Sequence, residues 1–415
     1  MSTEGHNHHF GTKVLPRNQL PGLTVFLPQA VLQRSFSLMV NSFTQGLCHI
    51  NLGALQRNFR RCGDASLLMP VIKADAYGHG LLQAAHALSD CGARRFAIGV
   101  VDEGAFLRHY GYRQDIVSLM PPTSMDEWKK ASAENIAPVV CTFDDLAKAR
   151  TCGSREKPFD VAIKIETGMH RLGFREEQIP SLVETLKAAP EIRPAYVVSH
   201  FAVSDVPEEA DYTKMQYDTF TRMSSALKEA FPAIQRSLQN SAGAIVFRDA
   251  PFEVRRPGIT LYGGNPFYGT SKADLGSDFE WVMSLSTKIL QITELRKGET
   301  VSYGRTFTAP RNMKLAVAGG GYATGVPRLL SNRLEALVHG RRVRQVGRVC
   351  MSMLMLDVTE IPDVKAGDDA WLLGGTPAPG EKAVTPQDWA DMLGTISYEV
   401  LCLVGSLNPR VYEYK

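Results

Sequence analysis

The sequence lacks a strong excess of charge of either sign. Its 46 Lys and Arg side chains nearly balance its 43 Asp and Glu side chains, which leaves a formal net charge of +3 over 415 residues. Nucleic-acid-binding proteins usually concentrate positive charge, so this balance argues against a nucleic-acid partner. The sequence also lacks any uninterrupted apolar run of the roughly 18 residues that a membrane-spanning helix requires. We therefore expect neither nucleic acid nor a membrane as a partner.

Cysteines are few, and they are not paired in sequence. The seven cysteines stand at positions 48, 62, 91, 141, 152, 350 and 402, and no two of them form a C-x-x-C pair. Disulfide frameworks and zinc sites require closer, paired spacing, so the sequence predicts no metal site and a reducing, cytoplasmic location. Residues 25–40 are apolar but are interrupted by Pro28 and Arg34. A signal peptide has a basic start and a cleaner apolar stretch, so we do not expect export.

Residues 1–43 are expected to form an N-terminal extension. Histidines at positions 6, 8 and 9 are typical of a flexible polar tail rather than of a metal site. Met39 stands shortly before the first strand-like segment, and we hypothesise that it is the natural start. The rest of the chain has an ordinary globular composition, with 44% hydrophobic residues. At roughly 150 residues per domain, its length predicts two or three domains.

Short apolar runs recur through the first two thirds of the chain. Most are rich in Val and Ile, as is typical of strands buried on both faces. Helix-like stretches with one apolar face lie between most of them, for example at 176–189 and 211–230. This alternation predicts an α/β fold with a (β/α)8 barrel over residues 44–278, although a doubly wound sheet would show the same pattern. The eight runs are 67–74, 96–100, 115–120, 137–142, 159–166, 193–201, 236–240 and 252–263.

The pattern changes after about residue 279. Residues 281–292 alternate between apolar and polar side chains, which predicts a half-buried antiparallel strand. A helix is indicated where Thr385, as N-cap, is followed by Pro386 and Asp388. We therefore predict a second, mostly β domain over residues 279–415. Its further strands are expected at 313–318, 334–338, 343–346, 352–358 and 369–373.

Polar residues cluster where the predicted barrel strands end, which is where barrel enzymes carry their chemistry. Lys73 follows the apolar segment Met69–Ile72, and a desolvated lysine there would be a nucleophile for a Schiff base. A lysine that extends into solvent is the alternative. Ser241 and Gly258 lie in the loops after strands seven and eight, which commonly bind phosphate. Together these features suggest pyridoxal phosphate, although an aldolase would fit the same two features.

Nine segments carry a resemblance to a known family. They are VIKADAYGHG (71–80), TGMHRLGF (167–174), SHFAVSD (199–205), QNSAG (239–243), RRPGITLYG (255–263), VSYGRTF (301–307), GYATGVPRLLSN (321–332), GRVCM (347–351) and TISYEV (395–400). In their order and spacing, over about residues 46–415, they resemble the alanine racemases. The resemblance implies a barrel followed by a β domain, a head-to-tail homodimer with shared active sites, and pyridoxal 5'-phosphate as cofactor. It also implies interconversion of L-alanine and D-alanine, a peptidoglycan precursor.

The resemblance assigns two catalytic bases. Lys73 matches the lysine that binds the cofactor covalently, and Tyr303 matches the opposite base, which the partner subunit contributes. Racemisation requires two such groups on opposite faces, because one removes the α-proton and the other protonates the far side. Arg256 matches the arginine that faces the pyridine nitrogen, and a guanidinium does not readily give that nitrogen a proton. His200 matches the histidine that supports this arginine.

The remaining assignments also follow from the resemblance. The phosphate is expected to contact Tyr77, Ser241, Gly258, Ile259 and Tyr398, with Asn240 adjacent in the cofactor site. The substrate carboxylate is expected to contact Arg171 and the backbone of Met351, and Lys164 matches a lysine that is often carbamylated and would then face Arg171. The narrow entrance corridor, which favours small amino acids, is expected to contain Asp205, Tyr322, Arg328, Arg348 and Ile396.

The sequence departs from the family pattern at four positions. Ser352 and Thr324 stand where carboxylates are common, and Asp75 and Asn51 exchange acid and amide. These departures leave open a serine racemase or a racemase of broader specificity. A decarboxylase of the same architecture and a non-catalytic cofactor-binding protein are further alternatives. The intact T-G-M-x-R-L-G, S-Y-G and C-M segments favour the alanine racemase.

Overall fold

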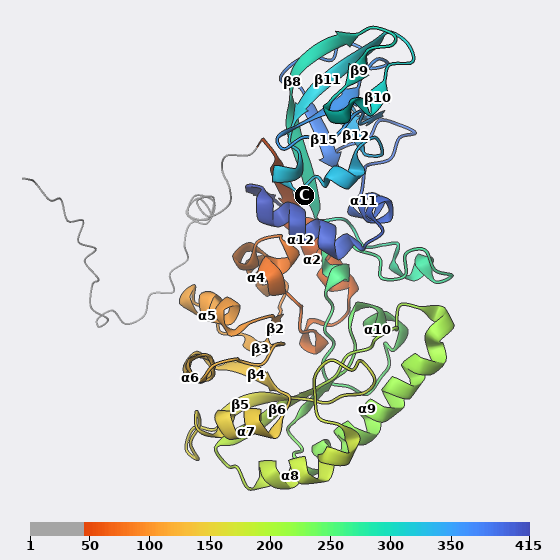
Figure 1. Cartoon of the computed structure of the whole chain (residues 1–415). Coiled ribbons are helices and arrows are strands. Elements are labelled where there is room, and N and C mark those ends of the chain that lie inside the picture. The colour runs from red at the N-terminus through yellow and green to blue at the C-terminus, as the bar shows by residue number, and fades with distance from the viewer. Residues whose placement is uncertain (1–44) are drawn as a thin grey trace, which may run out of the picture.

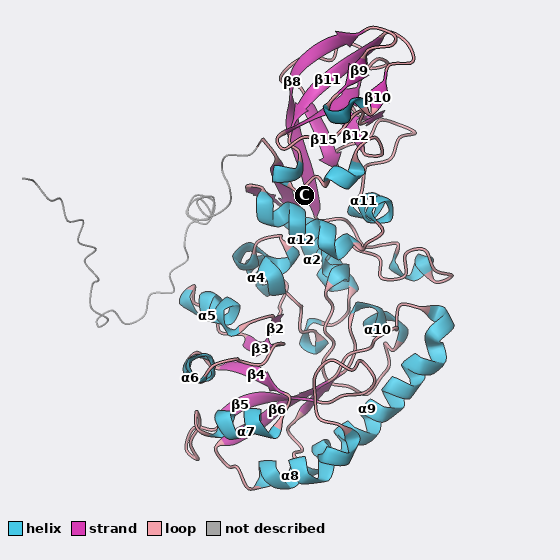
Figure 2. Ribbon diagram, viewed as in Figure 1, coloured by secondary structure: helices cyan, strands magenta, loops and turns pink. Residues whose placement is uncertain are grey.

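The computed structural model describes residues 45–415, and Figure 1 shows their arrangement. The predicted extension 1–43, its histidines and the hypothesised start at Met39 lie outside the described residues. The described part consists of a barrel with helices around its outside and a β domain at one end (Figures 1 and 2).

Six parallel strands form most of the barrel wall, in the order in which they follow along the chain. Each agrees with one of the predicted apolar runs to within a few residues. They are β2 (Arg95–Ile98), β3 (Asp115–Ser118), β4 (Ile136–Val140), β5 (Phe159–Lys164), β6 (Ile192–Val198) and β7 (Gln235–Ser237).

Two short extended segments close the barrel between β7 and β2. Val71 pairs with Ala97 of β2, and Leu68 pairs with Arg255, both in parallel. On the other side, the N–H of Val254 donates to the carbonyl of Arg236 in β7 at 3.1 Å. The wall is therefore continued by six strands and two extended segments, which confirms the predicted barrel and excludes the doubly wound sheet. The last predicted run ends earlier than expected, because residues 259–262 form a 3-10 turn.

Helices cover the outside of the barrel (Figure 2). Side-chain caps fix where several of them begin: the Ser124 hydroxyl accepts from the Glu127 N–H, and Thr142 and Asp145 form a capping box. The helices that precede or follow the strands are α2 (Leu52–Arg61), α4 (Leu81–Asp90), α5 (Val101–His109), α6 (Met125–Ala133), α7 (Phe143–Arg150), α8 (Ile179–Lys187), α9 (Ala210–Ala230) and α10 (Ser241–Val246).

The C-terminal domain is built on one long strand, β8 (Met283–Leu295), which pairs with β1, β11 and β15. The strands predicted in this region are all present, with small shifts of their ends. They are β11 (Met313–Gly319), β12 (Glu335–Val338), β13 (Arg341–Arg344), β14 (Met353–Asp357) and β15 (Asp369–Leu373), with β9 (Thr300–Val301) and β10 (Phe307–Thr308) as a separate pair.

Strand β1 (Leu47–Asn51) precedes the barrel in the chain but belongs to the sheet of the β domain. It pairs antiparallel with β8 and parallel with β16 (Arg410–Glu413), so that His49 lies opposite Ser284 and Val411. The range expected for the barrel includes β1, whereas its hydrogen bonds tie it to the last described strand.

Two helices near the C-terminus connect the domains. α11 (Pro386–Leu393) begins at Thr385 as predicted: the Asp388 N–H donates to the Thr385 hydroxyl at 3.1 Å, and the Thr385 N–H donates to the Asp388 carboxylate at 2.8 Å. α12 (Ser397–Leu407) lies between the barrel and the β domain (Figure 1). Within residues 45–415 no single helix has the length and apolar content to cross a membrane. α11 and α12 meet that criterion only as a pair, bent by 112°.

Candidate active site

Lys73 lies at the end of the first barrel segment. The residues that follow it form a turn in the left-handed helical conformation. Residues 74–77 all have φ between 53° and 54°, although none of them is glycine. A residue with a Cβ is less stable in this conformation by about 1–2 kcal/mol. The left-handed turn (residues 74–77) therefore requires compensating contacts, and it places Tyr77 next to the mouth of the barrel.

His79 provides one of these contacts. The imidazole is fully buried, and its Nδ1 lies 2.9 Å from the carbonyl oxygen of Ala76 and 3.0 Å from that of Tyr77. Burial lowers the pKa of His79 to about 3, so the ring is neutral and Nδ1–H donates to the turn. The ring also stacks on Tyr262, at 4.6 Å between centroids, and Tyr262 stacks on Tyr77 at 4.7 Å.

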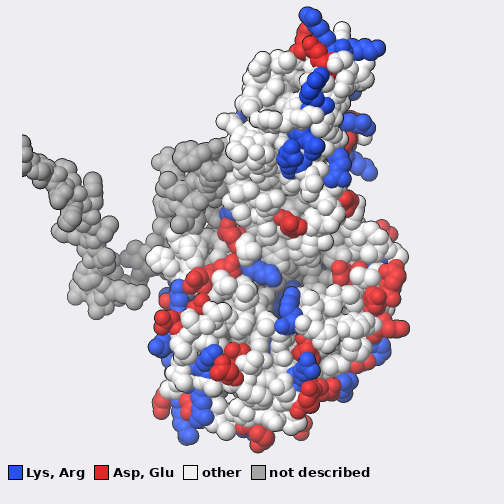
Figure 3. All heavy atoms as spheres, in the orientation of Figure 1, with Lys and Arg blue, Asp and Glu red and all other residues white. Residues whose placement is uncertain are grey.

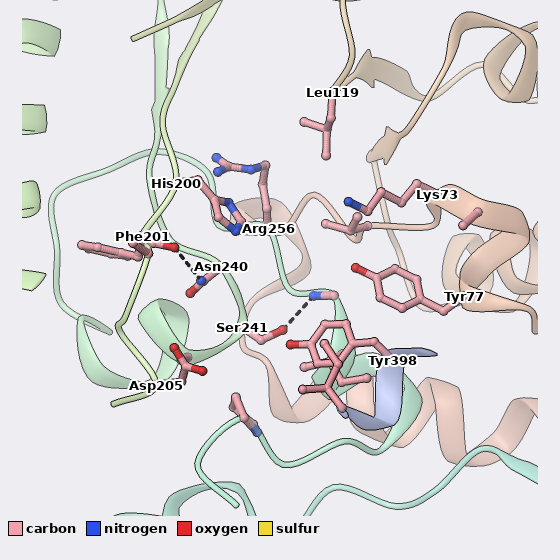
Figure 4. A pocket seen from close by; sticks show the side chains of 18 of the residues that line it. Lys73, Tyr77, Leu119, His200, Phe201, Asp205, Asn240, Ser241, Arg256 and Tyr398 are labelled. Atoms are coloured by element: carbon pink, nitrogen blue, oxygen red, sulfur yellow. Dashed lines mark hydrogen bonds between the residues drawn. The ribbon is translucent and has the colours of Figure 1, made fainter. Parts of the chain in front are cut away.

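A cavity of about 630 Å³ opens at the carboxyl ends of the barrel strands. It gathers most of the residues predicted for the cofactor, from loops far apart in the sequence (Figure 4). The predicted site residues in its wall are Lys73, Tyr77, His200, Asp205, Asn240, Ser241, Arg256, Gly258, Ile259, Ile396 and Tyr398.

One side of the cavity carries hydrogen-bond donors suited to a phosphate. The Gly258 N–H donates to the Ser241 hydroxyl at 2.9 Å, and a Cβ on Gly258 would lie 2.7 Å from the Tyr77 hydroxyl oxygen. The Tyr77 and Tyr398 rings lie 6.0 Å apart, and burial raises the pKa of both phenols. Both hydroxyls therefore keep their protons and remain donors, which is what an anionic phosphate requires.

Lys73 extends into this cavity from the side opposite His200 (Figure 4). Its side chain lines the cavity and is partly exposed there. Burial and, to a smaller degree, the charge of Arg171 lower the pKa of the Lys73 ammonium. A larger share of the amine is therefore neutral at a given pH, which favours its reaction with an aldehyde.

Arg256 is buried beneath His200 and held by the strand ends. Its Nη1 donates to the carbonyl of Ser237 at 2.8 Å, and its Nη2 donates to the carbonyl of Ser199. The hydrogen bonds of Arg256 thus go to these groups rather than to His200, which was expected to support it. Burial lowers the pKa of Arg256 to about 10 and that of His200 well below its ordinary value. The pair is a cationic guanidinium beside a neutral imidazole.

Lys164, at the end of β5, lies behind the cavity wall. Burial, together with the nearby charges of Arg256 and Arg171, lowers the pKa of its ammonium to about 7. Arg171 is on the loop after β5, where its backbone N–H donates to the Glu166 carboxylate at 3.2 Å. Neither Lys164 nor Arg171 is part of the cavity lining.

The other predicted residues lie on the β domain, away from this cavity. Tyr303 is 71% exposed and Met351 is 58% exposed. Tyr303 borders a separate apolar hollow of about 460 Å³, together with Val301 and Met353. Much of the left side of this domain carries no charged side chain in Figure 3. One chain therefore does not bring Lys73 and Tyr303 together. The corridor residues lie in the β domain as well: Tyr322 and Arg328 begin short 3-10 turns, and Arg348 is on a loop.

The structure adds residues that the sequence did not indicate. Cys402 lines the cavity one helical turn after Tyr398, so a helix predicted over 397–407 would have placed both on one face.

Thr324, which stands where an acid is common in the family pattern, is buried. Its hydroxyl both accepts from and donates to the backbone of Gly321 at 2.9 Å. Thr324 therefore stabilises the turn that starts at Gly321, and it does not line the cavity.

Comparison with protein-family models assigns most of the described chain. The alanine racemase N-terminal domain matches residues 50–266, and the alanine racemase C-terminal domain matches residues 282–412. The chain belongs to the alanine racemase family. Family membership makes it an isomerase that interconverts L-alanine and D-alanine and depends on pyridoxal phosphate, as the sequence motifs predicted.

Individual relatives agree with the family assignment. The alanine racemase of Nitratidesulfovibrio vulgaris strain Miyazaki F is 47% identical over 367 residues, which are 88% of this chain and 97% of that protein. The alanine racemase of Lawsonia intracellularis is 40% identical, over 82% and 90% of the two chains. Neither is named a serine racemase or a decarboxylase.

Solved structures share the fold. The alanine racemase of E. faecalis superposes with a TM-score of 0.81 at 27% identity, covering 90% of this chain and all of that one (100%). The alanine racemase of Bartonella henselae, solved with covalently bound pyridoxal phosphate, gives a TM-score of 0.77 at 25% identity, over 89% and 99% of the chains.

Proposed function

We propose that this chain racemises alanine as a cytoplasmic homodimer, with Lys73 of one subunit and Tyr303 of the partner subunit as the two bases. The observation that carries the proposal is the position of these two residues. Lys73 projects into a cavity rich in phosphate donors, whereas Tyr303 is exposed on the other domain of the same chain. A head-to-tail dimer joins the two kinds of surface, and each active site then takes residues from both subunits.

The cavity fits pyridoxal phosphate by its donor set. Hydroxyls of Tyr77, Ser241 and Tyr398 and the N–H groups of Gly258 and Ile259 would bind the phosphate, with Asn240 beside them. When bound there, the cofactor withdraws electrons from the substrate α-carbon and so acidifies its proton. The buried Arg256 cation would face the ring nitrogen and keep that nitrogen unprotonated.

The two bases then act on opposite faces of the α-carbon. The Lys73 amine takes the proton from one face, and its lowered pKa favours the neutral form that this step requires. The hydroxyl of Tyr303 of the partner subunit supplies a proton to the other face, and the roles reverse for the opposite enantiomer. A tyrosine acts as a base only where a nearby cation stabilises its deprotonated form, so the assembled dimer would have to provide one.

Arg171 and the backbone N–H of the partner subunit's Met351 would bind the substrate carboxylate. Asp205 and Ile396 line the cavity from one subunit, and Tyr322, Arg328 and Arg348 would complete the corridor from the other. A corridor with so many side chains admits a short amino acid more readily than a long one.

Carbamylation of Lys164 is supported by its surroundings. The lowered pKa, about 7, leaves a large share of the amine neutral near pH 7, and the neutral amine attacks the carbon of CO2 with loss of one proton. The product is an anion, and the nearby Arg171 and Arg256 cations stabilise it.

The first experiment measures α-proton exchange in D2O by NMR, with chiral analysis, for L-alanine, L-serine and L-lysine given to the purified holoenzyme. Exchange with inversion that is fastest for alanine is expected. Comparable rates for serine or lysine would instead favour the broader-specificity alternative left open by Ser352 and Thr324. Loss of CO2 without inversion would overturn the proposed reaction.

The shared site is tested with hybrid dimers of Lys73→Ala and Tyr303→Phe. Each variant alone is expected to be inactive in both directions, because each of its sites lacks one base. When the two variants are unfolded together and refolded in equal amounts, half of the dimers are hybrids. Each hybrid has one site with both bases, so about a quarter of wild-type activity should return. No recovery would show that both bases act within one subunit.

A further inference from the structure

One ion pair ties the left-handed turn to the far end of the chain. Asp75, the second residue of the turn, has its Oδ2 2.6 Å from Nη2 of Arg410 in β16. The Arg410 side chain is only 9% exposed, and its Nε and Nη2 also donate to the carbonyl of Gly405 at 3.1 and 2.8 Å. A guanidinium this buried requires a counter-charge, and Asp75 is the carboxylate that meets it.

Asp75 joins the turn to three other elements at once. Its Oδ1 accepts the N–H of Leu81, the first residue of α4, at 2.6 Å. Its own backbone N–H donates to the carboxylate of Glu103 in α5 at 3.2 Å. The contact with β16 is the ion pair of Asp75 among the described residues, and it leads from the barrel into the β domain.

The backbone of α12 reinforces this contact. A Cβ on Gly405 would lie 2.1 Å from the carbonyl oxygen of Gly78, and a Cβ on Gly78 would lie 2.6 Å from the carbonyl oxygen of Leu401. The helix and the end of the turn therefore touch backbone to backbone. Any movement of β16 and α12 must displace the segment that starts at Lys73.

We propose that Asp75 and Arg410 are positioning residues for Lys73: their ion pair fixes the left-handed turn against the β domain and so aims the amine into the cavity. The inference rests on the proposed function, because it concerns the lysine that captures the cofactor. Neither residue lines the cavity, so neither acts on the substrate directly.

The decisive variant is Asp75→Asn. Asparagine adopts positive φ more readily than most residues, and its side-chain oxygen still accepts the Leu81 N–H. The substitution therefore removes the charge and preserves the turn. Arg410→Gln removes the other partner, and Arg410→Lys retains a cation. Glu335→Gln is the matched control, because it breaks a half-buried ion pair with Arg342 (2.7 Å) elsewhere in the β domain.

Two ligands separate positioning from general damage to the cavity. Apoprotein is mixed with pyridoxal phosphate, whose covalent capture by Lys73 changes its absorption. In parallel it is mixed with pyridoxamine phosphate, which has no aldehyde and binds without Lys73.

We expect Asp75→Asn and Arg410→Gln to slow the covalent capture of pyridoxal phosphate by about tenfold or more, since small displacements of reacting groups have large effects on rate. Affinity for pyridoxamine phosphate should fall by a smaller factor than the capture rate, because Tyr77 lies on the turn but Ser241, Gly258 and Ile259 lie on other loops. Arg410→Lys should recover part of the rate, and Glu335→Gln should match wild type.

Two results would overturn the inference. One is capture by Asp75→Asn at the wild-type rate; the other is an equal loss for both ligands, which would show a disturbed cavity rather than a misplaced lysine. Melting temperatures of the apoproteins show whether each variant folds. If an Arg410 variant does not fold, the capture rate of Asp75→Asn alone tests the inference. If wild-type protein itself formed no covalent bond with pyridoxal phosphate, the proposed function would fail, and this inference with it.

Discussion

At the scale of single residues, Lys164 should carry a carbamate whose amount depends on pH. Because its pKa is lowered to about 7, the neutral amine that reacts with CO2 becomes the main form as pH rises from 6 to 8. We expect a carbamate signal by carbon-13 NMR in labelled bicarbonate, increasing over this range. The Lys164→Met variant should lack it. A wild-type spectrum without the signal at pH 8 would refute the modification.

Gly258 is a second residue with a measurable role. Its φ of −122° and ψ of −88° lie outside the regions that residues with a Cβ prefer, and a Cβ there would meet the Tyr77 hydroxyl at 2.7 Å. Gly258→Ala should therefore displace this hydroxyl and raise the dissociation constant for pyridoxal phosphate by about tenfold, the effect of losing one charge-assisted hydrogen bond.

The comparison uses equilibrium binding to apoprotein in two backgrounds. In Tyr77→Phe, which has no hydroxyl to displace, the added alanine should have a much smaller effect. Equal losses in both backgrounds would mean that Gly258 acts independently of Tyr77.

Residues within continuous motifs were predictable from sequence. Lys73, Ser241 and Gly258 follow apolar runs at strand ends, and the structure places them in one cavity. Arg410 was not predictable, because its meaning depends on Asp75, a residue at the other end of the described chain. A local sequence pattern does not predict the ion pair between Asp75 and Arg410, because only the tertiary fold brings the two residues together.

At the scale of elements, the left-handed turn should make stability sensitive to acid. His79 has a pKa near 3 when folded but an ordinary value of 6.5 when unfolded, so the unfolded chain binds the extra proton between these values. The free energy of unfolding should therefore fall as pH decreases from 6.5 towards 3, by about 1.4 kcal/mol per pH unit from this group. This loss is absent above pH 6.5.

Urea unfolding at pH 7 and pH 5 measures the effect. His79→Phe should be less stable than wild type at pH 7 by about 1–3 kcal/mol, because two buried carbonyls lose their donor, yet it should lose less on acidification. His86→Gln, at an exposed histidine on α4, should keep the wild-type pH dependence. The same pH dependence in His79→Phe would contradict the assignment.

The helices and strands whose apolar residues repeat with a clear helical or strand period were predictable from the sequence. Those without such a period were not. β8 alternates and α9 has one apolar face, and both stand where the sequence indicated. α12 buries one face, through Val400, Leu401 and Val404, but it also carries apolar side chains such as the exposed Leu403, so its sequence shows no clear helical period. β1 and β16 are short and pair with each other across the length of the described chain, so their sequences alone do not reveal their partner.

At the scale of the whole molecule, the exposed apolar hollow around Tyr303 predicts that dimerisation and activity are lost together. Met353 is 46% exposed beside this hollow. Met353→Asp would place an unpaired charge in the proposed interface. The cost of about 3 kcal/mol weakens dimerisation by roughly 100-fold.

Sedimentation should show monomers of Met353→Asp that still bind pyridoxal phosphate, because the described cofactor cavity belongs to one chain, but that do not racemise alanine. Leu275→Asp, at another exposed apolar residue, should remain dimeric and active. A fully active monomer would exclude the shared site.

The pairing of β1 with β8 and β16 sets an order of events during synthesis. β1 leaves the ribosome before the barrel but finds its neighbours only after the barrel is complete. Its parallel partner, which carries Arg410, follows the whole barrel and the other described strands of the β domain. Domains that fold as they are made usually finish from the N-terminus onward. Here the contact that secures the lysine-bearing turn requires β16, so we expect the nascent chain to acquire its cofactor-binding geometry only after β16 has been synthesised.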